Sequence, residues 1–446
     1  MSILRAGTRR RVAIALAAGL LLAAIAHADW LAPDASYRDA QLQLRYATRD
    51  TAGHGDDVAR LDTLATALLR LGRTNEARKL FERTLASKPG NPAACAALGK
   101  LALWADRTTE AESLLTLAGP FEGATNDLYA SRLRRAAWGA AAGLCTDVGD
   151  DGRQPLLERL AETPAMEVRG NHTQLLFERA WPAPLIRVKL NGTAVLMVLD
   201  TGTPGVLIDA TAMLRSRVTP VGGQRLTPWG GTRVAVRNAI IQELRIGDIT
   251  ITNVPAGALK LHKLSLAVNP QAETIAGVIG MSVLRQFDVT FDYPRRRVEF
   301  APHGTAATIS GTRVPFDLWG ECSLVVWGNI NGGRRMAMSL SSGLPEAGLG
   351  APEGVFDELG LKPGGVSKLM KGAGSWMQGR PWAAVNVPAL TLGGVAFDKL
   401  PGWSGAMEPI EMWREGVRKD ALLGPAIFRG RRVSIDWAKH DLVFAD

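Results

Sequence analysis

The hydrophobic positions follow two different patterns along the chain. From about Asp56 to Gly119 the apolar residues recur at helical spacing, whereas beyond Pro182 short apolar or alternating runs are separated by Gly, Pro and Asn. Recurrence at three and four residues predicts amphipathic helices, and short runs between turn residues predict strands. Residues 155–178 form the transition between the two patterns. The chain is therefore expected to be multidomain, with an all-α part followed by an all-β part.

The helical part contains a repeat of 34 residues. Apolar or small residues recur at this spacing in the pairs Leu64/Leu98, Leu68/Ala102, Ala77/Ala111, Leu80/Leu114 and Phe81/Leu115. This period resembles tetratricopeptide repeats (TPR), in which paired helices stack on their neighbours. The family's signature positions would be occupied by Leu64, Ala77, Phe81, Pro89, Leu98, Gly99 and Ala111. A third, degenerate unit is expected from about Asn126 to Leu160, and an ordinary helical bundle is the alternative.

The β-rich part repeats internally as well. A hairpin turn of the Asn-Gly type separates the first two expected strands at Asn191-Gly192, and it recurs at Asn331-Gly332. Three further pairs of segments match in the same order, with offsets of 141, 146 and 144 residues: Met197–Gly202 with Met338–Gly343, Leu244–Gly247 with Leu390–Gly393, and Ile279–Tyr293 with Leu423–Trp437. These ordered matches predict two duplicated lobes. Short helices are also expected within the β-rich part, at Ser282–Gln286 and Pro352–Leu359.

Composition and charge narrow the classes of function. The chain has 446 residues, of which 46% are hydrophobic and 21% charged, as is typical of a globular protein. Its formal net charge of +9 falls to +5 when the four arginines of residues 1–28, a segment without acidic residues, are removed. A surplus of this size over so long a chain is weak support for nucleic-acid binding, and none is expected.

Residues 1–28 have the pattern of a secretory signal peptide. Arg9–Arg11 supply a positive start, Val12–Ile25 is an apolar run, and Ala26-His27-Ala28 matches a cleavage site, with cleavage expected after Ala28. A membrane anchor is the alternative, but the apolar run is shorter than the ~20 residues that a spanning helix needs. The mature chain is therefore expected to be periplasmic or secreted, without a membrane span.

Cysteine and histidine usage argues against several kinds of site. Cys95, Cys145 and Cys322 are too few for a disulfide-stapled scaffold or a Cys-rich metal site. Cys95 and Cys145 could pair in an oxidising compartment, but their spacing does not decide this. The six histidines show no spacing typical of metal ligands, and neither a metal nor another cofactor is expected.

Two basic turns occur near the expected closing strands of the lobes, Arg295–Arg297 and Arg429–Arg432. Arginines at hairpin edges hinder edge-to-edge association of sheets. We prefer this interpretation of the two turns to a binding site for a polyanion.

The candidate chemistry begins at Asp200-Thr201-Gly202, where an apolar strand is expected to end. A carboxylate in such a position is costly unless it is hydrogen-bonded or functional. The context resembles the retropepsin-like and pepsin-like aspartic proteases, with a hairpin, an apolar run into Asp-Thr-Gly, a Gly-rich flap, an apolar-apolar-Gly segment and a closing strand that carries Asp. The matching segments are 191–192, 195–202, 228–231, 278–280 and 291–292. The resemblance covers residues 183–303 and, more faintly, 313–446, and it implies a two-lobed, all-β fold.

In that family two aspartates, one from each lobe, share a proton, so that one acts as an acid while the other activates water. The resemblance implies that Asp200 is a catalytic residue, that Thr201 and Gly202 support its loop, and that Trp229 and Gly230 belong to the flap. The aligned residues of the second lobe are Ser341, Ser342 and Gly343. Ser342 and Gly343 would keep the loop support, but Ser341 replaces the second aspartate.

Three interpretations follow from this replacement. Two chains could pair their first lobes, so that Asp200 meets its symmetry mate in a homodimeric endopeptidase. The two lobes of one chain could instead pair as an inactive module that binds peptide, or Glu346 could replace the missing acid. The intact Asp-Thr-Gly favours an exported aspartic-type endopeptidase that acts on peptides or unfolded proteins. Ser341 favours the inactive alternative, in which the TPR-like repeats also bind a partner protein.

The expected domains follow from these patterns. They are a signal peptide at 1–28, a TPR-like helical domain at 29–165, a retropepsin-like lobe with Asp-Thr-Gly at 180–305 and a degenerate second lobe at 306–446.

Overall fold

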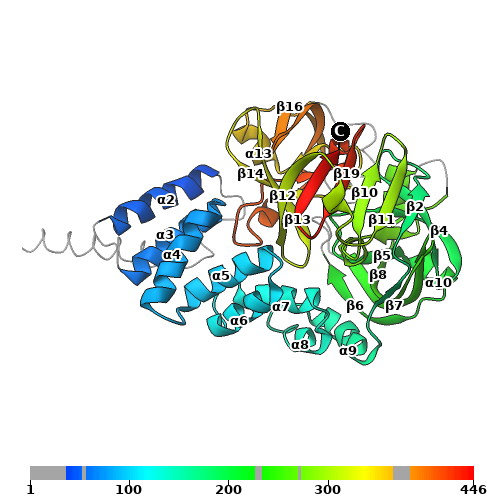
Figure 1. Ribbon diagram of the computed structural model, residues 1–446, viewed down its shortest axis with the longest axis horizontal. Coiled ribbons are helices and arrows are strands. Elements are labelled where there is room, and N and C mark those ends of the chain that lie inside the picture. The colour runs from blue at the N-terminus through cyan, green and yellow to red at the C-terminus, as the bar shows by residue number, and fades with distance from the viewer. Residues whose placement is uncertain (1–36, 53–56, 227–233, 270–272, 365–381, 446) are drawn as a thin grey trace, which may run out of the picture.

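The computed structural model describes residues 37–52, 57–226, 234–269, 273–364 and 382–445. A helical domain comes first and lies along one side of two β lobes (Figure 1). This arrangement confirms the expected fold class, in which TPR-like helical repeats precede an all-β, two-lobed region. Within the described ranges, no helix combines the length and the apolarity needed to cross a membrane. The expected signal peptide lies outside the described residues.

The helices of the first domain are α2 (Tyr37–Thr51), α3 (Val58–Arg70), α4 (Thr74–Ser87), α5 (Pro92–Trp104), α6 (Thr108–Ala118), α7 (Ala124–Arg134), α8 (Trp138–Ala142) and α9 (Gln154–Glu162). Helices α3 and α4 coincide with the first expected repeat unit, and α5 and α6 with the second. Helices α7 to α9 occupy the region of the degenerate third unit. The hydrophobic pattern did not indicate α2, which precedes the repeats.

Two local signals explain why the repeat units fold alike. The side chains of Asp57 and Asn91, which are 34 residues apart, cap the N-termini of α3 and α5 by accepting hydrogen bonds from backbone N–H groups. Within the second unit, a Cβ atom added to Gly99 would lie 2.7 Å from Cγ of Leu115 in α6. A residue without a side chain is therefore needed where α5 and α6 cross.

The first lobe is a barrel-like sheet with the strand order β1-β8-β5-β9-β4-β3-β7-β6. Its strands are β1 (Glu167–Arg169), β3 (Leu185–Leu190), β4 (Thr193–Leu199), β5 (Val206–Asp209), β6 (Pro220–Leu226), β7 (Val234–Ile246), β8 (Ile249–Leu259) and β9 (Gly277–Ile279). Short helices interrupt them at α10 (Ala210–Arg215), α11 (His262–Val268) and α12 (Met281–Leu284). The expected turn at Asn191-Gly192 joins β3 to β4, and both of its residues have positive φ. This is the backbone conformation that an Asn-Gly hairpin turn requires.

The strands of the second lobe and those at the junction between the lobes form one continuous sheet. Its strand order is β14-β18-β15-β17-β16-β13-β12-β20-β19-β10-β11-β2. The strands of this sheet that precede the second lobe are β2 (Thr173–Leu176), β10 (Asp288–Asp292) and β11 (Arg297–Ala301). Those of the second lobe are β12 (Thr312–Trp319), β13 (Ser323–Ile330), β14 (Met336–Leu340), β15 (Leu349–Ala351), β16 (Ala383–Leu392), β17 (Val395–Ser404), β18 (Ala421–Leu423), β19 (Arg432–Asp436) and β20 (Asp441–Ala445). Helix α13 (Glu353–Glu358) follows β15, within the helix expected at 352–359.

The two lobes meet at an approximate twofold axis. Strands β10 and β19 pair in antiparallel fashion, with Thr290 opposite Ser434. These residues are 144 apart in sequence and are therefore repeat mates. Their hydroxyl oxygens lie 2.7 Å apart within hydrogen-bonding distance. A residue that pairs with its own repeat mate marks the axis that relates the lobes, as duplication predicts.

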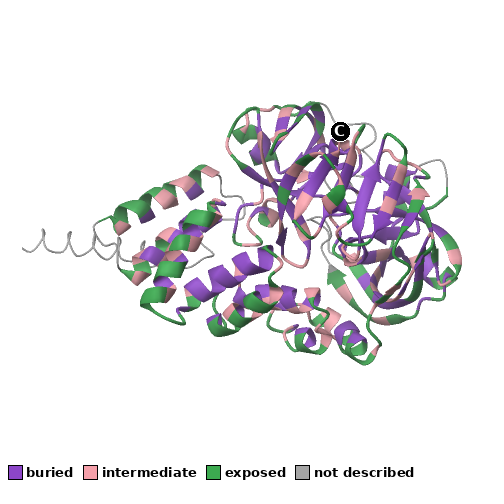
Figure 2. Ribbon diagram, in the orientation of Figure 1, coloured by how far each residue is buried: buried purple, intermediate pink, exposed green. Residues whose placement is uncertain are grey.

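The helical domain contacts both lobes. Trp104 of α5 stacks on Trp319 of β12 in the second lobe, with ring centroids 4.4 Å apart. Arg134 of α7, whose side chain is 1% exposed, donates hydrogen bonds to the backbone carbonyls of Leu318, Gly320 and Glu321. In the first lobe, the side-chain amide of Asn238 donates to the carbonyl of Gly152, just before α9. Figure 2 shows α5 as almost wholly buried, as expected for a helix between other layers.

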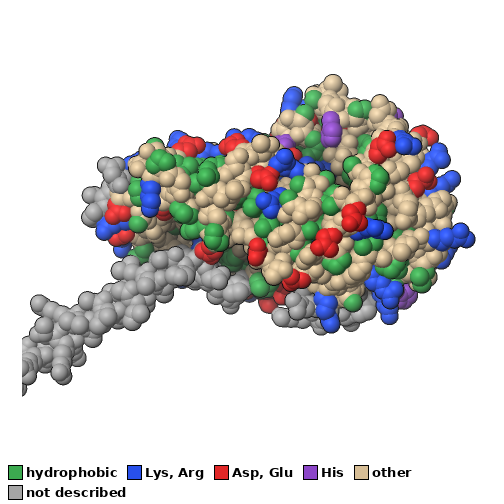
Figure 3. Space-filling view, turned by 90° about the horizontal axis from the view of Figure 1, so that it is seen from below, with side chains coloured by type: hydrophobic (Ala, Val, Ile, Leu, Met, Phe, Trp, Pro, Cys, Tyr) green, Lys and Arg blue, Asp and Glu red, His purple; other side chains and the backbone are tan. Residues whose placement is uncertain are grey.

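On the face shown in Figure 3, acidic and basic side chains are interspersed over the helical domain and the lobes.

The three cysteines are buried and free. The pairing of Cys95 with Cys145 that the sequence left open is therefore not made in this structure, and Cys322 is likewise a free thiol. The described part of the helical domain is therefore held by packing and polar contacts, without a disulfide bond between Cys95 and Cys145.

Candidate active site

The same backbone construction delivers Asp200 and Ser341 to the junction of the lobes. Asp200 follows β4, which is parallel to β9, and its N–H donates to the carbonyl of Ile279 at 3.0 Å. Ser341 follows β14, which is parallel to β18, and its N–H donates to the carbonyl of Leu423 at 2.7 Å. Ile279 and Leu423 are themselves repeat mates. The two loops are therefore held in equivalent positions.

The carboxylate of Asp200 is buried, with 3% of the residue exposed, and both of its oxygens accept hydrogen bonds. Oδ1 accepts from the N–H groups of Gly202 and Gly343, at 2.8 and 2.9 Å. It also accepts from the hydroxyl of Ser341 at 3.0 Å. Oδ2 accepts from the hydroxyl of Thr203 at 2.7 Å. Hydrogen-bond donors from both lobes thus satisfy a carboxylate that would otherwise be costly to bury.

Two hydroxyl groups join the loops reciprocally. The N–H of Thr201 donates to Oγ of Ser342, and the N–H of Ser342 donates to Oγ1 of Thr201, both at 3.1 Å. The Ser342 hydroxyl in turn donates to the carbonyl of Leu199 at 2.9 Å. Both side chains are fully buried. This bracing uses only hydroxyl and backbone groups, so it does not depend on the acid at either neighbouring position.

Two glycines allow the loops to approach each other. A Cβ atom added to Gly202 would lie 2.5 Å from Cβ of Ser341, and one added to Gly343 would lie 2.6 Å from Cβ of Asp200. Both distances are far shorter than a van der Waals contact between carbon atoms. Glycine is therefore required at both positions for the loops to lie side by side.

The structure brings together Asp200, Thr201, Gly202, Ser341, Ser342 and Gly343, which sequence reasoning singled out. The flap candidates Trp229 and Gly230 lie outside the described residues. Sequence reasoning missed Thr203, whose hydroxyl bonds to Asp200. The available signal was a hydroxyl three residues after an acid at a strand end, a position that often bonds to that acid. The repeat mate of Thr203 is Leu344, which is buried and apolar.

Glu346 is held near the site by its backbone, and its side chain is not among the hydrogen-bond partners of Asp200. Its N–H donates to the carbonyl of Pro182 at 3.1 Å, and burial raises the pKa of its carboxyl group. Within the described part of the chain, no hydrogen bond joins its side chain to Asp200 or Ser341. In the same ranges, no three His, Cys, Asp or Glu side chains are grouped so that they could hold a metal ion.

The arrangement therefore offers one carboxylate and one hydroxyl where two carboxylates would be needed to share a proton. The Ser341 hydroxyl can donate a hydrogen bond to Asp200, as it does here, but it does not ionise in the pH range in which a carboxyl group does. The described site lacks a second group that could exchange a proton with Asp200 during hydrolysis.

Comparisons with known proteins agree with this geometry. Residues 186–283 match the family model for aspartyl protease, and residues 56–133 match that for tetratricopeptide repeat. These matches confirm the two resemblances predicted from the sequence. The first lies within the first lobe and includes Asp200, and it ends before the second lobe begins.

Two solved structures are similar to parts of the chain. A retropepsin-like aspartic protease from Rickettsia conorii is 12% identical, with a TM-score of 0.21, and the match covers 30% of this chain and 91% of that one. An aspartic proteinase from Irpex lacteus is 10% identical, with a TM-score of 0.39, and the match covers 61% of this chain and 97% of that one. No curated protein matches the chain.

Proposed function

We propose that this chain is an exported protein that binds extended polypeptide segments between its two lobes, beside Asp200, without efficient hydrolysis of the peptide bond. The observation that carries the proposal is the hydrogen bond of 3.0 Å from the Ser341 hydroxyl to Oδ1 of Asp200. It indicates that the lobes of a single chain pair with each other and that the partner of Asp200 is a serine.

The chemistry of peptide hydrolysis explains why this pairing matters. In a carboxylate pair, like charges a few Å apart cannot both ionise, so one group remains protonated as the acid while the other activates water. Ser341 can orient Asp200 but provides neither that charge nor that proton. Hydrolysis by Asp200 alone would lack the general acid, whose contribution is roughly 100-fold or more.

A homodimeric protease is less compatible with the observed contacts. The reciprocal bonds of Thr201 with Ser342 and the pairing of β10 with β19 already occupy the surfaces through which two first lobes would meet. A dimer built on Asp200 would have to displace the second lobe of each chain. We therefore favour pairing within one chain.

An exported aspartic endopeptidase is the second candidate function. It is favoured by the intact loop of Asp200, whose four hydrogen bonds from Gly202, Thr203, Ser341 and Gly343 hold the carboxylate in place. Export rests for both candidates on the signal-peptide pattern of residues 1–28.

Stacked helical repeats of the TPR type commonly bind other proteins. In this chain, at least part of the surface of the repeats contacts the chain's own second lobe. Leu68 of α3 and Trp104 of α5 pack in one cluster with Trp319 and Val325 of that lobe. A partner protein would therefore have to bind the remaining surface of the helices. We propose that the repeats hold the two lobes together first and recruit partners second.

The decisive experiment restores the missing acid. Four forms of the full mature chain are compared: wild type, Ser341→Asp, Asp200→Asn and the double variant. Each is incubated with unfolded casein between pH 3.5 and 7, with and without a statine inhibitor. We expect cleavage by the wild type to be slow at most, and cleavage by Ser341→Asp to be faster by roughly 100-fold or more. The double variant, which keeps the added acid but lacks Asp200, should be inactive.

Two outcomes would contradict the proposal. Cleavage by the wild type that is about as fast as that by Ser341→Asp and is lost in Asp200→Asn would support the endopeptidase, and a specific activity that rises with protein concentration would support its dimeric form. A folded but inert Ser341→Asp variant would show that the missing acid is not what prevents hydrolysis. Peptide binding by the wild type and Asp200→Ala, measured by fluorescence anisotropy, tests the binding function independently, and we expect similar affinities.

A further inference from the structure

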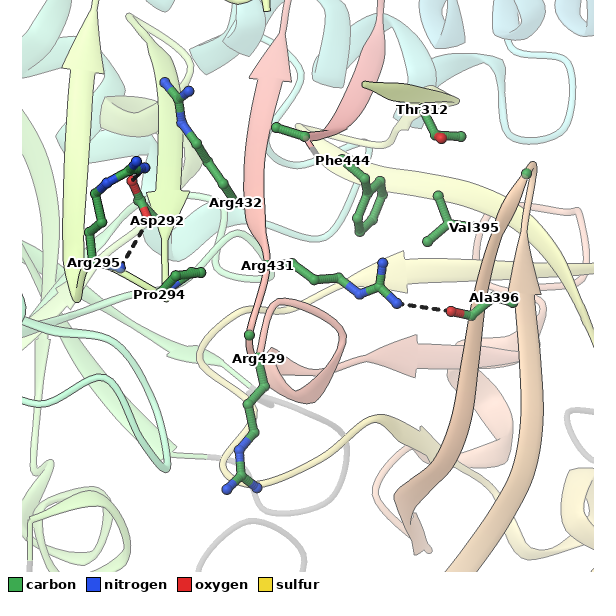
Figure 4. A pocket seen from close by; sticks show the side chains of 13 residues that line it. Asp292, Pro294, Arg295, Thr312, Val395, Ala396, Arg429, Arg431, Arg432 and Phe444 are labelled. Atoms are coloured by element: carbon green, nitrogen blue, oxygen red, sulfur yellow. Dashed lines mark hydrogen bonds and ion pairs between the residues drawn. The ribbon is translucent and has the colours of Figure 1, made fainter. Parts of the chain in front are cut away.

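Two arginine-rich turns come together at the junction of the lobes. Arg295–Arg297 follows β10 closely, and Arg429–Arg432 leads into β19. Because these strands are antiparallel, with Asp292 opposite Arg432, the end of one strand lies beside the start of the other. Side chains from both lobes consequently surround a cavity of about 910 Å³ (Figure 4). The preferred interpretation of the turns as protected hairpin edges did not anticipate a cavity.

Positive charge dominates the lining of this cavity. It includes four arginines, namely Arg295, Arg429, Arg431 and Arg432. The only acidic side chain among the described residues that line it is Asp292. The lining therefore has a surplus of three positive charges, whereas acidic and basic side chains are interspersed on the face shown in Figure 3.

The single carboxylate is already paired. Asp292 is 2% exposed and lies 3.1 Å from Nη1 of Arg295 and 3.4 Å from Nε of Arg297. Burial opposes its ionisation, but hydrogen bonds from the backbone and side chain of Arg295, together with the charges of both arginines, hold the pKa of Asp292 below its ordinary value. Its negative charge is thus shared by two arginines, and one of them, Arg297, does not line the cavity.

Of the remaining arginines, Arg429 and Arg431 contact only neutral groups among the described residues, whereas Arg432 forms an ion pair with Glu299. Arg431 donates to the carbonyl of Ala396 at 3.0 Å, and Arg429 lies 5.0 Å from the centroid of the Trp181 ring. In the described part of the chain, neither has an acidic partner. The carboxylate nearest to Arg432 belongs to Glu299, at 3.8 Å. Ring and carbonyl contacts orient the guanidinium groups of Arg429 and Arg431 but leave the charge of these two side chains available to a ligand.

The distribution of the arginines indicates the kind of ligand. Figure 4 shows Arg429 and Arg431 pointing in different directions, so one small anion cannot contact all four side chains. Several anionic groups within a short chain are needed to balance the surplus charge. Linked phosphate groups concentrate charge in this way and match the fork of guanidinium donors. An acidic peptide would have to place three separate acidic side chains in the cavity.

We propose that this cavity binds a ligand with two or more phosphate groups, either free in solution or clustered at a lipid surface. The site is separate from Asp200 and does not rest on the function proposed for it. Phosphate groups would bridge Arg295 and Arg432 at the strand ends to Arg429 and Arg431 in the adjoining turn.

The test measures binding of inorganic tripolyphosphate to the full mature chain by isothermal titration calorimetry at two salt concentrations. We expect binding by the wild type that weakens as salt rises, and a loss of roughly tenfold per arginine in the Arg429→Gln/Arg431→Gln variant. The matched control is Arg215→Gln/Arg237→Gln, which removes two exposed arginines that lie outside both turns and do not line the cavity. It should bind within about twofold of the wild type. Circular dichroism confirms that both variants are folded.

Two further measurements distinguish a soluble phosphate ligand from phosphate groups at a lipid surface. Co-sedimentation with phosphatidylglycerol vesicles that tripolyphosphate prevents would identify a lipid surface, and binding of tripolyphosphate alone would identify a soluble ligand. Both results support the proposal. It is overturned if tripolyphosphate does not bind the wild type, if the Arg429→Gln/Arg431→Gln variant binds as tightly as the control, or if polyglutamate binds more tightly than tripolyphosphate, since that would indicate an acidic peptide.

Discussion

The two lobes of this chain share a scaffold but differ at the atoms that would carry chemistry. In both lobes a strand ends beside a parallel neighbour, a glycine permits close approach, and a hydroxyl braces the opposite loop. The differences are Asp200 against Ser341 and Thr203 against Leu344. The bracing hydroxyls of Thr201 and Ser342 do not involve the carboxylate. A lobe that has no acid at this position can therefore still hold the other lobe's loop in place.

The lobes also differ in how they contact the helical domain. The second lobe supplies Trp319 to a buried aromatic stack and three carbonyl groups to Arg134. The first lobe contacts the end of the same domain, through Asn238 and through the packing of α9 against β6. The second lobe, which carries Ser341, thus provides the larger share of the described polar anchoring. Its sequence is constrained by the domain interface as well as by pairing with the first lobe.

The largest effect on the free energy of unfolding is expected when the buried guanidinium group of Arg134 is removed from the interface between the helical domain and the second lobe. Arg134→Met keeps an unbranched apolar stem but removes the guanidinium group, and so leaves the carbonyls of Leu318, Gly320 and Glu321 without this donor. We expect the free energy of unfolding to fall by roughly 3–5 kcal/mol. Urea unfolding followed by circular dichroism measures it.

The matched control is Arg159→Met, on α9, where the side chain is 61% exposed. It should change stability by about 0.5 kcal/mol or less. A loss below about 1 kcal/mol in Arg134→Met would show that the interface with the second lobe contributes little.

An intermediate effect is expected at the glycines that bring the two active-site loops together. Gly202→Ala and Gly343→Ala should each lower the free energy of unfolding by roughly 1–3 kcal/mol, because each new methyl group would overlap the opposite loop. Gly205→Ala is the control, since a Cβ there would meet no atom within 4 Å. Thermal and urea unfolding test all three variants. If only one of the two glycines were sensitive, the approach of the loops would not be symmetric.

The sequence predicted this symmetric part of the site because the duplication is visible in it. The offset of 141 residues between Met197–Gly202 and Met338–Gly343 predicts that Ser341 lies opposite Asp200. The offset of 144 likewise predicts that Thr290 and Ser434 are equivalent. Both predictions hold because repeat mates in paired lobes must lie about a common axis.

Other contacts left no such signal. Arg134 and Leu318 are 184 residues apart in sequence and belong to different folds, so no period relates them. Helix α2 lies before the repeats, and its few buried positions, Ala40 and Ala47, are too sparse to define a hydrophobic face. The cavity between the arginine-rich turns arises only from the antiparallel register of β10 and β19. Contacts between separate elements require coordinates, because local patterns do not specify them.

The smallest effect on the free energy of unfolding is expected at Glu358, a carboxylate of the second lobe that is hydrogen-bonded to the first residue of α2. Glu358, at the end of α13, accepts hydrogen bonds from the backbone N–H of Tyr37 and from the guanidinium groups of Arg334 and Arg418. Burial opposes its ionisation, but the two arginines and the N–H group hold the pKa of Glu358 below its ordinary value. The unfolded chain therefore binds a proton at this position more readily than the folded chain does.

It follows that Glu358 stabilises the fold above the ordinary pKa of a glutamate, about 4.3, and that this stabilisation is lost as the pH falls through the lower pKa of the folded state. Glu358→Gln should lower the free energy of unfolding by about 1.5 kcal/mol at pH 7 and by progressively less toward pH 3. Glu178→Gln is the first-lobe control, because Glu178 and Arg187 form an exposed pair, each 44% accessible, whose removal should cost about 0.5 kcal/mol or less. Urea unfolding of the three proteins across this pH range measures the difference. A Glu358→Gln deficit that stays constant with pH would mean that hydrogen bonding to the side chain, rather than its charge, ties α2 to the second lobe.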